Sequence, residues 1–378
     1  MRSTDCPSTK KESKLDLILK PTSSCNYRCT FCSSTVLSDQ QTDVLDLAYI
    51  DRFVERFAST LNTVIVNGGD PLMMPVQYYW DILEILKKYD CEAKLSFTSN
   101  LWAFYKKPDL WTELFRHPQV GVITSFQYGD KRLKGDRTPF TEAEFWEISD
   151  LFLDRVGYRP EFIAVIDQDN EHTVLQTVEL AKAMGVECKI NHVLASGPEV
   201  NKQGVVMGSA KNFFTQADIY EHYVQIIEAG LGEWEYNCKQ LAKKLRGSHT
   251  TCPLSRSCDS GIRTLQPDGS YYSCGAFGDD RTHRIDFDQE MASAALQTPL
   301  QDDPDLDTMK LACYACPMFE ICNGCRKTIA DTKKFGLQEH QCRKMKSLAP
   351  KIIEINELTG VLIPTPYEDE SLELIFKG

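Results

Sequence analysis

The chain up to about residue 229 alternates between two hydrophobic patterns. Short runs rich in Leu, Ile and Val are typical of buried strands. Each is followed, after a loop, by a longer stretch whose apolar residues recur at spacings of three and four, as on an amphipathic helix. The predicted strands are 15–20, 63–66, 93–97, 120–125, 161–166 and 187–193. The predicted helices are 45–59, 75–89, 108–116, 141–155, 171–184 and 211–229. Six successive strand–helix units predict an α/β fold, a partial (β/α)6 barrel with parallel strands.

In a barrel of this kind the working face lies at the carboxyl ends of the strands, where loops vary without disturbing the packed interior. Each predicted strand is followed by residues that are unusual for a simple connection. In chain order these are Cys25 to Cys32, Gly68-Gly69-Asp70-Pro71, Thr98-Ser99-Asn100, Ser125 to Gly129, Asp167 to Asn170, and Ala195-Ser196-Gly197. We therefore expect these six groups to meet at one rim.

Three cysteines in the first of these groups, Cys25, Cys29 and Cys32, are spaced so that one short loop can present three thiolates to one iron–sulfur cluster. A cubane has four irons, so three thiolates leave one iron able to bind and activate a small molecule. A zinc knuckle or a disulfide pair is the alternative. Structural zinc, however, takes four ligands, and no fourth Cys or His lies nearby in the sequence.

Charge and composition limit the possible partners and the compartment. Lys and Arg number 42 against 54 Asp and Glu, so the net charge is −12, which disfavours a phosphate backbone or an anionic membrane surface. No apolar run approaches the roughly 20 residues of a membrane span. Fifteen cysteines in a chain without a leader-like apolar segment favour metal ligation over disulfides. The sequence therefore predicts a cytoplasmic protein that binds neither nucleic acid nor membrane.

Past about residue 250 the strand–helix alternation stops, prolines become frequent and cysteines gather. Eight thiols in this region suffice for two clusters with four ligands each, although two zinc sites are an alternative. The eight are Cys252, Cys258, Cys274, Cys313, Cys316, Cys322, Cys325 and Cys342. We accordingly expect four segments, an N-terminal tail over 1–14, the barrel over 15–245, a small irregular cysteine-rich domain over 246–345, and a packing segment over 346–378.

The run Cys-Asn-Tyr-Arg-Cys-Thr-Phe-Cys over residues 25–32 resembles the cluster motif of radical S-adenosylmethionine (radical SAM) enzymes. Gly68-Gly69-Asp70-Pro71 is similar to the Gly-Gly-Glu-Pro motif of that family, with Asp70 in place of Glu. The two glycines allow the backbone to approach a ligand closely and to turn carbonyls toward an ammonium group, and Asp70 adds negative charge. Without the cysteine loop, a structural turn would explain this run equally well.

The resemblance also implies contacts to SAM from other strand ends. Asn100 and Ser125 occupy positions where the family contacts the ribose or the methionine part, and Gln127 stands where an acid is common. Either Arg132 or Arg137 could offer a guanidinium to the SAM carboxylate, because a planar fork binds carboxylates bidentately. The sequence does not choose between these two arginines.

The spacing of the later cysteines resembles a SPASM domain, the auxiliary-cluster extension of radical SAM peptide maturases such as the anaerobic sulfatase-maturating enzymes. By resemblance, the inner cluster is held by Cys252, Cys258, Cys274 and Cys325, and the outer cluster by Cys313, Cys316, Cys322 and Cys342. One internal gap is a residue shorter than usual, at Asn323-Gly324. Sulfatase maturases also carry an Asp directly after the third SPASM cysteine, where this chain has Gly275.

The resemblance implies three [4Fe–4S] clusters, SAM as co-substrate, and a 5′-deoxyadenosyl radical that abstracts hydrogen to oxidise or cross-link a peptide. A flavodoxin- or ferredoxin-type protein would supply electrons, and a separate protein could recognise the peptide. A dehydrogenase or epimerase of a carbohydrate or aminocyclitol is the alternative enzyme. A non-catalytic electron-transfer protein is the third possibility, disfavoured because a pure relay does not need an open three-cysteine site.

Overall fold

A curved eight-stranded sheet forms the centre of the molecule. The computed structural model describes residues 14–32, 43–193, 214–245, 261–289, 316, 322 and 325–356. The strands are β1 (Leu15–Leu19), β2 (Leu61–Val66), β3 (Lys94–Thr98), β4 (Val120–Ser125), β5 (Glu161–Ile166), β6 (Cys188–His192), β7 (Ile262–Leu265) and β8 (Tyr271–Tyr272). Their order is β6-β5-β4-β3-β2-β1-β7-β8, and every neighbouring pair is parallel except β7 and β8.

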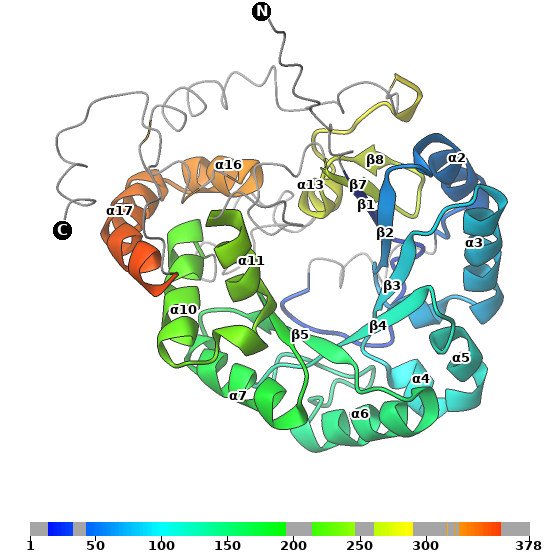
Figure 1. Cartoon of the computed structure of the whole chain (residues 1–378), viewed down its shortest axis with the longest axis horizontal. Helices are drawn as coiled ribbons and strands as arrows, with labels where there is room; N and C mark the ends of the chain where they lie inside the picture. Colours follow the sequence, from blue (N-terminus) through cyan, green and yellow to red (C-terminus); the bar gives the residue numbers. More distant parts are fainter. Residues whose placement is uncertain are drawn as a thin grey trace, which may run out of the picture.

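The helices that follow β1 to β5 lie along the convex side of this sheet (Figure 1). Those of the barrel are α2 (Leu47–Phe57), α3 (Val76–Lys88), α4 (Trp102–Lys106), α5 (Pro108–Phe115), α6 (Glu142–Val156), α7 (Val174–Met184), α10 (Gln216–Glu228) and α11 (Tyr236–Leu245). The later ones are α13 (Gly275–Asp280), α16 (Arg326–Lys334) and α17 (Gln338–Ile355). The six predicted strand–helix units and the partial-barrel fold class are therefore confirmed. Helices α4 and α11 were not predicted.

Local sequence signals set the ends of these elements. Helix α6 begins at a capping box, in which the Thr141 side chain accepts a hydrogen bond from the Glu144 amide and the Glu144 carboxylate accepts one from the Thr141 amide. It ends at Gly157, whose φ of 102° lies in the left-handed region that glycine adopts without strain.

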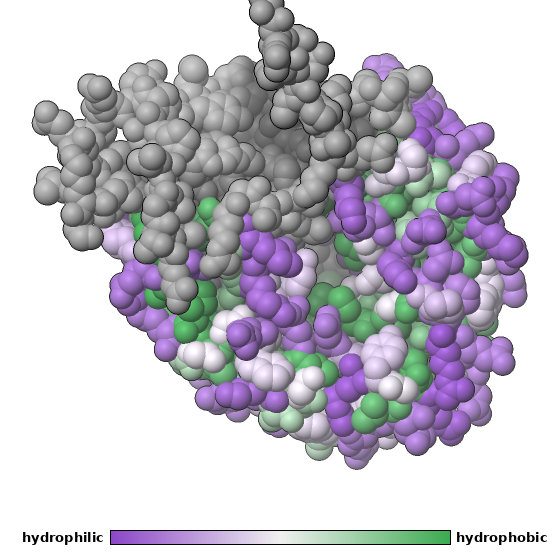
Figure 2. All heavy atoms as spheres, in the orientation of Figure 1, coloured by the Kyte–Doolittle hydropathy of each residue, from purple (hydrophilic) through white to green (hydrophobic). Residues whose placement is uncertain are grey.

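Successive side chains on each strand point to opposite faces of the sheet, one toward the helices and the next toward the barrel interior. In β3, Leu95 and Phe97 are wholly buried against the helices, whereas Ser96 between them and Thr98 after them are half-buried and face the other side. The Phe97 ring packs edge-on against Tyr79 of α3, with centroids 4.7 Å apart. Hydrophilic side chains predominate along the outer edge at α3 (Figure 2). The core thus lies between sheet and helices, which leaves the concave side for a site.

The sheet continues beyond the predicted barrel. Strand β7 pairs in parallel with β1 over Asp16–Leu19, so a segment from the cysteine-rich region joins the barrel sheet directly. At the opposite edge, the Glu235 carboxylate accepts from the Ile190 amide at 2.9 Å, and the Asn237 amide donates to the Ile190 carbonyl at 2.6 Å. These two side chains satisfy the exposed backbone of β6 and so protect the edge of the sheet.

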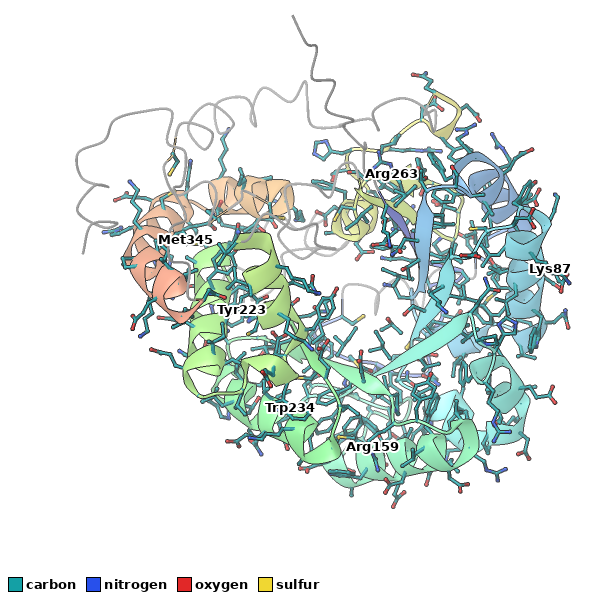
Figure 3. The ribbon with its side chains drawn as sticks, viewed as in Figure 1. Lys87, Arg159, Tyr223, Trp234, Arg263 and Met345 are labelled. Atoms are coloured by element: carbon teal, nitrogen blue, oxygen red, sulfur yellow. The ribbon has the colours of Figure 1, made fainter. Side chains whose placement is uncertain are left out.

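Helix α17 runs through the predicted boundary at 345/346 and packs against α10. Met345 of α17 and Tyr223 of α10, labelled in Figure 3, lie on these neighbouring helices, and both are buried. Lys344 of α17 also donates to Asp218 of α10 at 2.6 Å. Within the ranges given above, no helix is long and apolar enough to span a membrane.

Candidate active site

The loop of Cys25, Cys29 and Cys32 follows β1 and is braced by the segment that follows β4. The Arg28 amide donates to the Leu133 carbonyl at 2.8 Å, and the Thr30 amide donates to the Lys131 carbonyl at 3.1 Å. These bonds form a short antiparallel pairing between residues 27–30 and 131–134, which are far apart in the sequence. The cysteine loop is therefore held by tertiary contacts from two sides.

The three thiols are within electrostatic range of one another. Burial raises the pKa of the Cys25 thiol, and the nearby Asp70 carboxylate raises it further. The Tyr27 amide donates to Cys25 Sγ at 3.3 Å, which favours the thiolate. Across the described residues, no three Cys, His, Asp or Glu side chains converge on a single metal position. The fit of a cluster rests on the donor set, since soft thiolates on one loop are the ligands that iron–sulfur clusters take.

The turn of Gly68 and Gly69 lies directly against the chain that leads into the cysteine loop. The Gly69 amide donates to the Thr22 carbonyl at 3.0 Å, and the Asp70 amide donates to the Ser24 carbonyl at 2.8 Å. Gly68 has a φ of 125°, and a Cβ at Gly69 would lie only 2.0 Å from the Ser24 carbonyl oxygen. No residue but glycine fits at either position, so the structure brings this turn and the cysteine loop together as the sequence predicted.

The Asp70 carboxylate is directed into the protein. It accepts hydrogen bonds from the Leu72 amide at 2.9 Å, the Ser99 hydroxyl at 3.1 Å and the Asn100 amide at 2.9 Å, and it is 3% exposed. Burial raises the pKa of this carboxyl, while the hydrogen bonds oppose that rise. We expected Asp70 to add negative charge at the SAM site. In the structure its side chain is hydrogen-bonded to the residues that end β3, beside the glycine turn.

Asn100 links the end of β3 to the cysteine loop. Its side-chain amide donates to Asn26 Oδ1 at 2.7 Å, and its Oδ1 accepts from the Trp102 amide at 2.9 Å. Asn26 lies between Cys25 and Cys29 in the sequence, so Asn100 stands next to the loop on the side of β3. Sequence reasoning did not single out Asn26 or Ser99 as parts of this network, because both act through contacts with distant residues.

Arg132 joins Ser125 and Gln127 beside the cysteine loop. Its Nη1 donates to Ser125 Oγ and its Nε donates to Gln127 Oε1, both at 2.9 Å. The guanidinium carbon lies 5.3 Å from the centre of the Phe31 ring. Burial lowers the pKa of Arg132, although the nearby Cys29, Cys32 and Cys25 thiols favour its charged form.

The two candidate arginines lie in different surroundings. Arg132 is 6% exposed, and among the described residues no carboxylate forms an ion pair with it. The hydrogen-bond acceptors of this buried cation are neutral, and burying a cation is costly unless anionic groups lie close to it. Arg137 instead lies exposed in a turn with a φ of 65°, so the structure does not bring it to Ser125 and Gln127. Both arginines lie in the charged segment that follows β4, so the sequence around them gave no signal to tell Arg137 from Arg132.

A second charged group ties the ends of β4 and β5 together. Lys131 Nζ lies 2.5 Å from Asp167 Oδ2 and also contacts Asp169. The Asn170 amide donates to the Tyr128 carbonyl at 3.1 Å. The predicted residues after β5, Asp167 to Asn170, therefore lie at the same rim as the cysteine loop. Lys131, which is adjacent to Arg132, connects them to it.

His192 at the end of β6 is turned away from this rim. It shares a hydrogen bond of 2.8 Å with His222 of α10, and the two rings are buried beside Phe214. Ala195 to Gly197 of the predicted rim lie outside the described residues.

Five of the eight predicted auxiliary ligands are described. Cys274 is the N-cap residue of α13 and Cys325 that of α16, while Cys316, Cys322 and Cys325 pack partly buried against the core. Desolvation raises the pKa of the Cys342 thiol on α17, and the nearby Cys316 adds to this shift, which places these two predicted ligands of one cluster close together. Cys252, Cys258 and Cys313 lie outside the described residues.

The fold is similar to that of known proteins. The family model described as the radical SAM superfamily matches residues 19–202. The structure of anSMEcpe with bound AdoMet has a TM-score of 0.66 at 16% identity, covering 96% of this chain and 98% of that one. SuiB from Streptococcus suis bound to S-adenosylmethionine has a TM-score of 0.55 at 15% identity, covering 85% and 75%. No curated protein sequence matches significantly.

Proposed function

The chain belongs to the radical SAM superfamily through residues 19–202, and on that premise we propose that it oxidatively modifies a peptide. Membership makes it an enzyme that uses SAM and a [4Fe–4S] cluster. Beyond membership, we propose that the substrate is a peptide and that the later cysteines hold two auxiliary clusters. We also propose that a flavodoxin- or ferredoxin-type protein in the cytoplasm donates the electrons. The observation that carries the proposal is the meeting, at one rim, of the cysteine loop, the glycine turn and the buried Arg132.

Each group at this rim has a role that follows from its chemistry. Cys25, Cys29 and Cys32 would hold the cluster, which when bound supplies the electron that cleaves SAM to methionine and a 5′-deoxyadenosyl radical. Carbonyls of the Gly68-Gly69 turn would accept hydrogen bonds from the SAM ammonium. Arg132 would bind the SAM carboxylate, because its guanidinium is buried and its hydrogen-bond acceptors among the described residues, Ser125 and Gln127, are neutral. Asn100 and Asp70 would hold the cysteine loop and the glycine turn in fixed positions relative to each other.

A peptide substrate is supported by the extent of the structural likeness. The anSMEcpe structure with AdoMet and the Kp18Cys peptide covers 91% of this chain and 99% of that one, at 15% identity and a TM-score of 0.65. The likeness therefore runs past the barrel into the cysteine-rich region. A carbohydrate or aminocyclitol dehydrogenase or epimerase would use the same clusters and is the second candidate. Eight auxiliary thiols could saturate two clusters, which favours a role in accepting electrons from the substrate.

The test is production of 5′-deoxyadenosine by anaerobically reconstituted protein with SAM and dithionite. We expect the triple variant Cys25→Ala, Cys29→Ala, Cys32→Ala to lose this product to the background level, because it removes all three N-terminal ligands. The matched control is Cys91→Ala, which removes a buried cysteine that precedes β3, at the opposite end of that strand from the rim, and should leave the rate within about twofold. Continued SAM cleavage by the triple variant would remove the loop from its proposed role.

A further inference from the structure

Two consecutive aspartates at the end of α13 reach lysines in two different parts of the molecule. Asp279 contacts Lys20, and Asp280 Oδ2 lies 2.9 Å from Lys327 Nζ. All four side chains are at most 15% exposed. Helix α13 begins directly after Cys274, so both ion pairs start from a short helix that is attached to a predicted cluster ligand.

Lys20 belongs to the barrel and stands beside the candidate site. It follows β1 directly, and its amide donates to the Leu265 carbonyl at 3.0 Å. A Cβ built on Gly68 would lie 3.5 Å from Lys20 Cα, so the lysine is packed beside the glycine turn. Asp279 therefore connects the region of Cys274 to the base of the Cys25–Cys32 loop.

Lys327 belongs to α16, whose N-cap residue is Cys325. It donates to Asp331 Oδ1 at 2.6 Å as well as contacting Asp280, and its side chain is 6% exposed. A small hydrophobic cluster, separate from the main core, packs α13 against α16. It consists of Tyr272, Phe277 and Ile329, with Cys274 and Ala330 partly buried beside it. Cys274 and Cys325 are thus joined by both apolar packing and buried charge.

We infer that Asp279 and Asp280 are positioning residues, which fix Cys274 and Cys325 relative to the Cys25–Cys32 loop. The inference rests on the proposed function, because that proposal makes Cys274 and Cys325 ligands of one auxiliary cluster. A metal site must be held closely by the residues around its ligands, and buried ion pairs hold their partners firmly because a lone buried charge is costly. The pair Asp279–Lys20 fixes the cluster segments to the barrel, and Asp280–Lys327 fixes them to each other.

Hydrogen–deuterium exchange of the reconstituted full chain tests this. We expect Asp279→Asn to raise exchange about tenfold in peptides covering α13 and residues 20–32, because Lys20 loses its buried partner. Lys20→Met should have the same effect. The double variant Asp279→Asn, Lys20→Met should exchange no faster than either single variant, because the two substitutions break one and the same ion pair. The matched control is Asp288→Asn, since Asp288 also bridges to the barrel through Arg52, but with side chains that are 71% and 47% exposed. It should exchange like the wild type.

A second measurement reads the cluster positions directly. Pulsed electron paramagnetic resonance measures the magnetic coupling between reduced clusters, which depends on the distance between them. The distribution of this coupling should become broader in Asp280→Asn and stay unchanged in Asp288→Asn. Exchange in Asp279→Asn equal to that of Asp288→Asn, or additive effects in the double variant, would overturn the inference. If Asp279→Asn fails to fold, Asp279→Glu retains the charge and should exchange near the wild-type rate. Hydrogen exchange needs neither SAM nor substrate, so failure of the proposed function would show separately, as absent SAM cleavage in the wild type.

Discussion

The most informative single residue is Arg132, a buried cation whose neighbours are a hydroxyl, an amide oxygen and an aromatic ring. It lies within electrostatic range of all three loop thiols, and its charge favours the thiolate form of Cys29. It also retains the capacity to bind an anionic ligand. A single guanidinium can therefore serve both the metal ligands and the carboxylate of SAM, and its removal should affect both.

We predict that Arg132→Gln weakens SAM binding by about tenfold or more, since a charge-assisted contact to a carboxylate is lost. The dissociation constant should be measured by calorimetry on reconstituted protein, with iron content determined on the same sample. Arg137→Gln is the control, and it should bind SAM like the wild type because Arg137 is exposed. The reverse result, in which only the Arg137 variant loses affinity, would restore Arg137 as the carboxylate ligand.

At the scale of elements, β6 and α10 are joined by a histidine pair. His192 and His222 are 8% and 6% exposed, and burial lowers the pKa of both imidazoles below the ordinary value. Both are therefore neutral in the folded protein at pH 7. In the unfolded chain a histidine binds a proton near pH 6.5, so acidification below that value favours unfolding.

We predict that the free energy of unfolding falls as the pH is lowered from 7 to 5.5, by up to about 1.4 kcal/mol per pH unit for each histidine that stays neutral. His222→Gln, which cannot titrate, should reduce this slope. Denaturant unfolding at the two pH values measures it. Phe214→Leu is the control, because it alters packing against His192 and should lower stability equally at both pH values. An unchanged slope in His222→Gln would contradict this account.

At the scale of the whole molecule, the cysteine-rich region is continuous with the barrel. Strand β7 extends the barrel sheet, α17 packs on α10, and the buried ion pair of Asp279 with Lys20 joins α13 to the barrel. A protein built in this way should hold all its clusters in one structural unit.

Anaerobically reconstituted protein should contain about twelve irons per chain if three cubanes form. The variant lacking Cys25, Cys29 and Cys32 should lose about four of them and keep the rest. Iron and zinc are determined together by elemental analysis. A total near four irons accompanied by bound zinc would favour the zinc alternative for the later cysteines.

The sequence was sufficient to predict those strands and helices whose own residues carry a clear hydrophobic pattern. Buried parallel strands such as β5 (Glu161–Ile166) are short apolar runs that can be recognised directly. Strand β7 was missed because it has only four residues, includes Arg263, and forms by pairing with β1. The position of the glycine turn was predictable, whereas the direction of the Asp70 side chain and the burial of Arg132 beside Ser125 depend on contacts between distant segments.

The pairing of residues 27–30 with 131–134 also determines an order of events during synthesis. The three cysteines leave the ribosome early, but the backbone partners of their loop are made only after the fourth strand. We therefore expect a cluster to be inserted at these cysteines only after the fourth strand has been made. A nascent chain arrested before residue 131 should therefore be unable to retain a cluster at these cysteines.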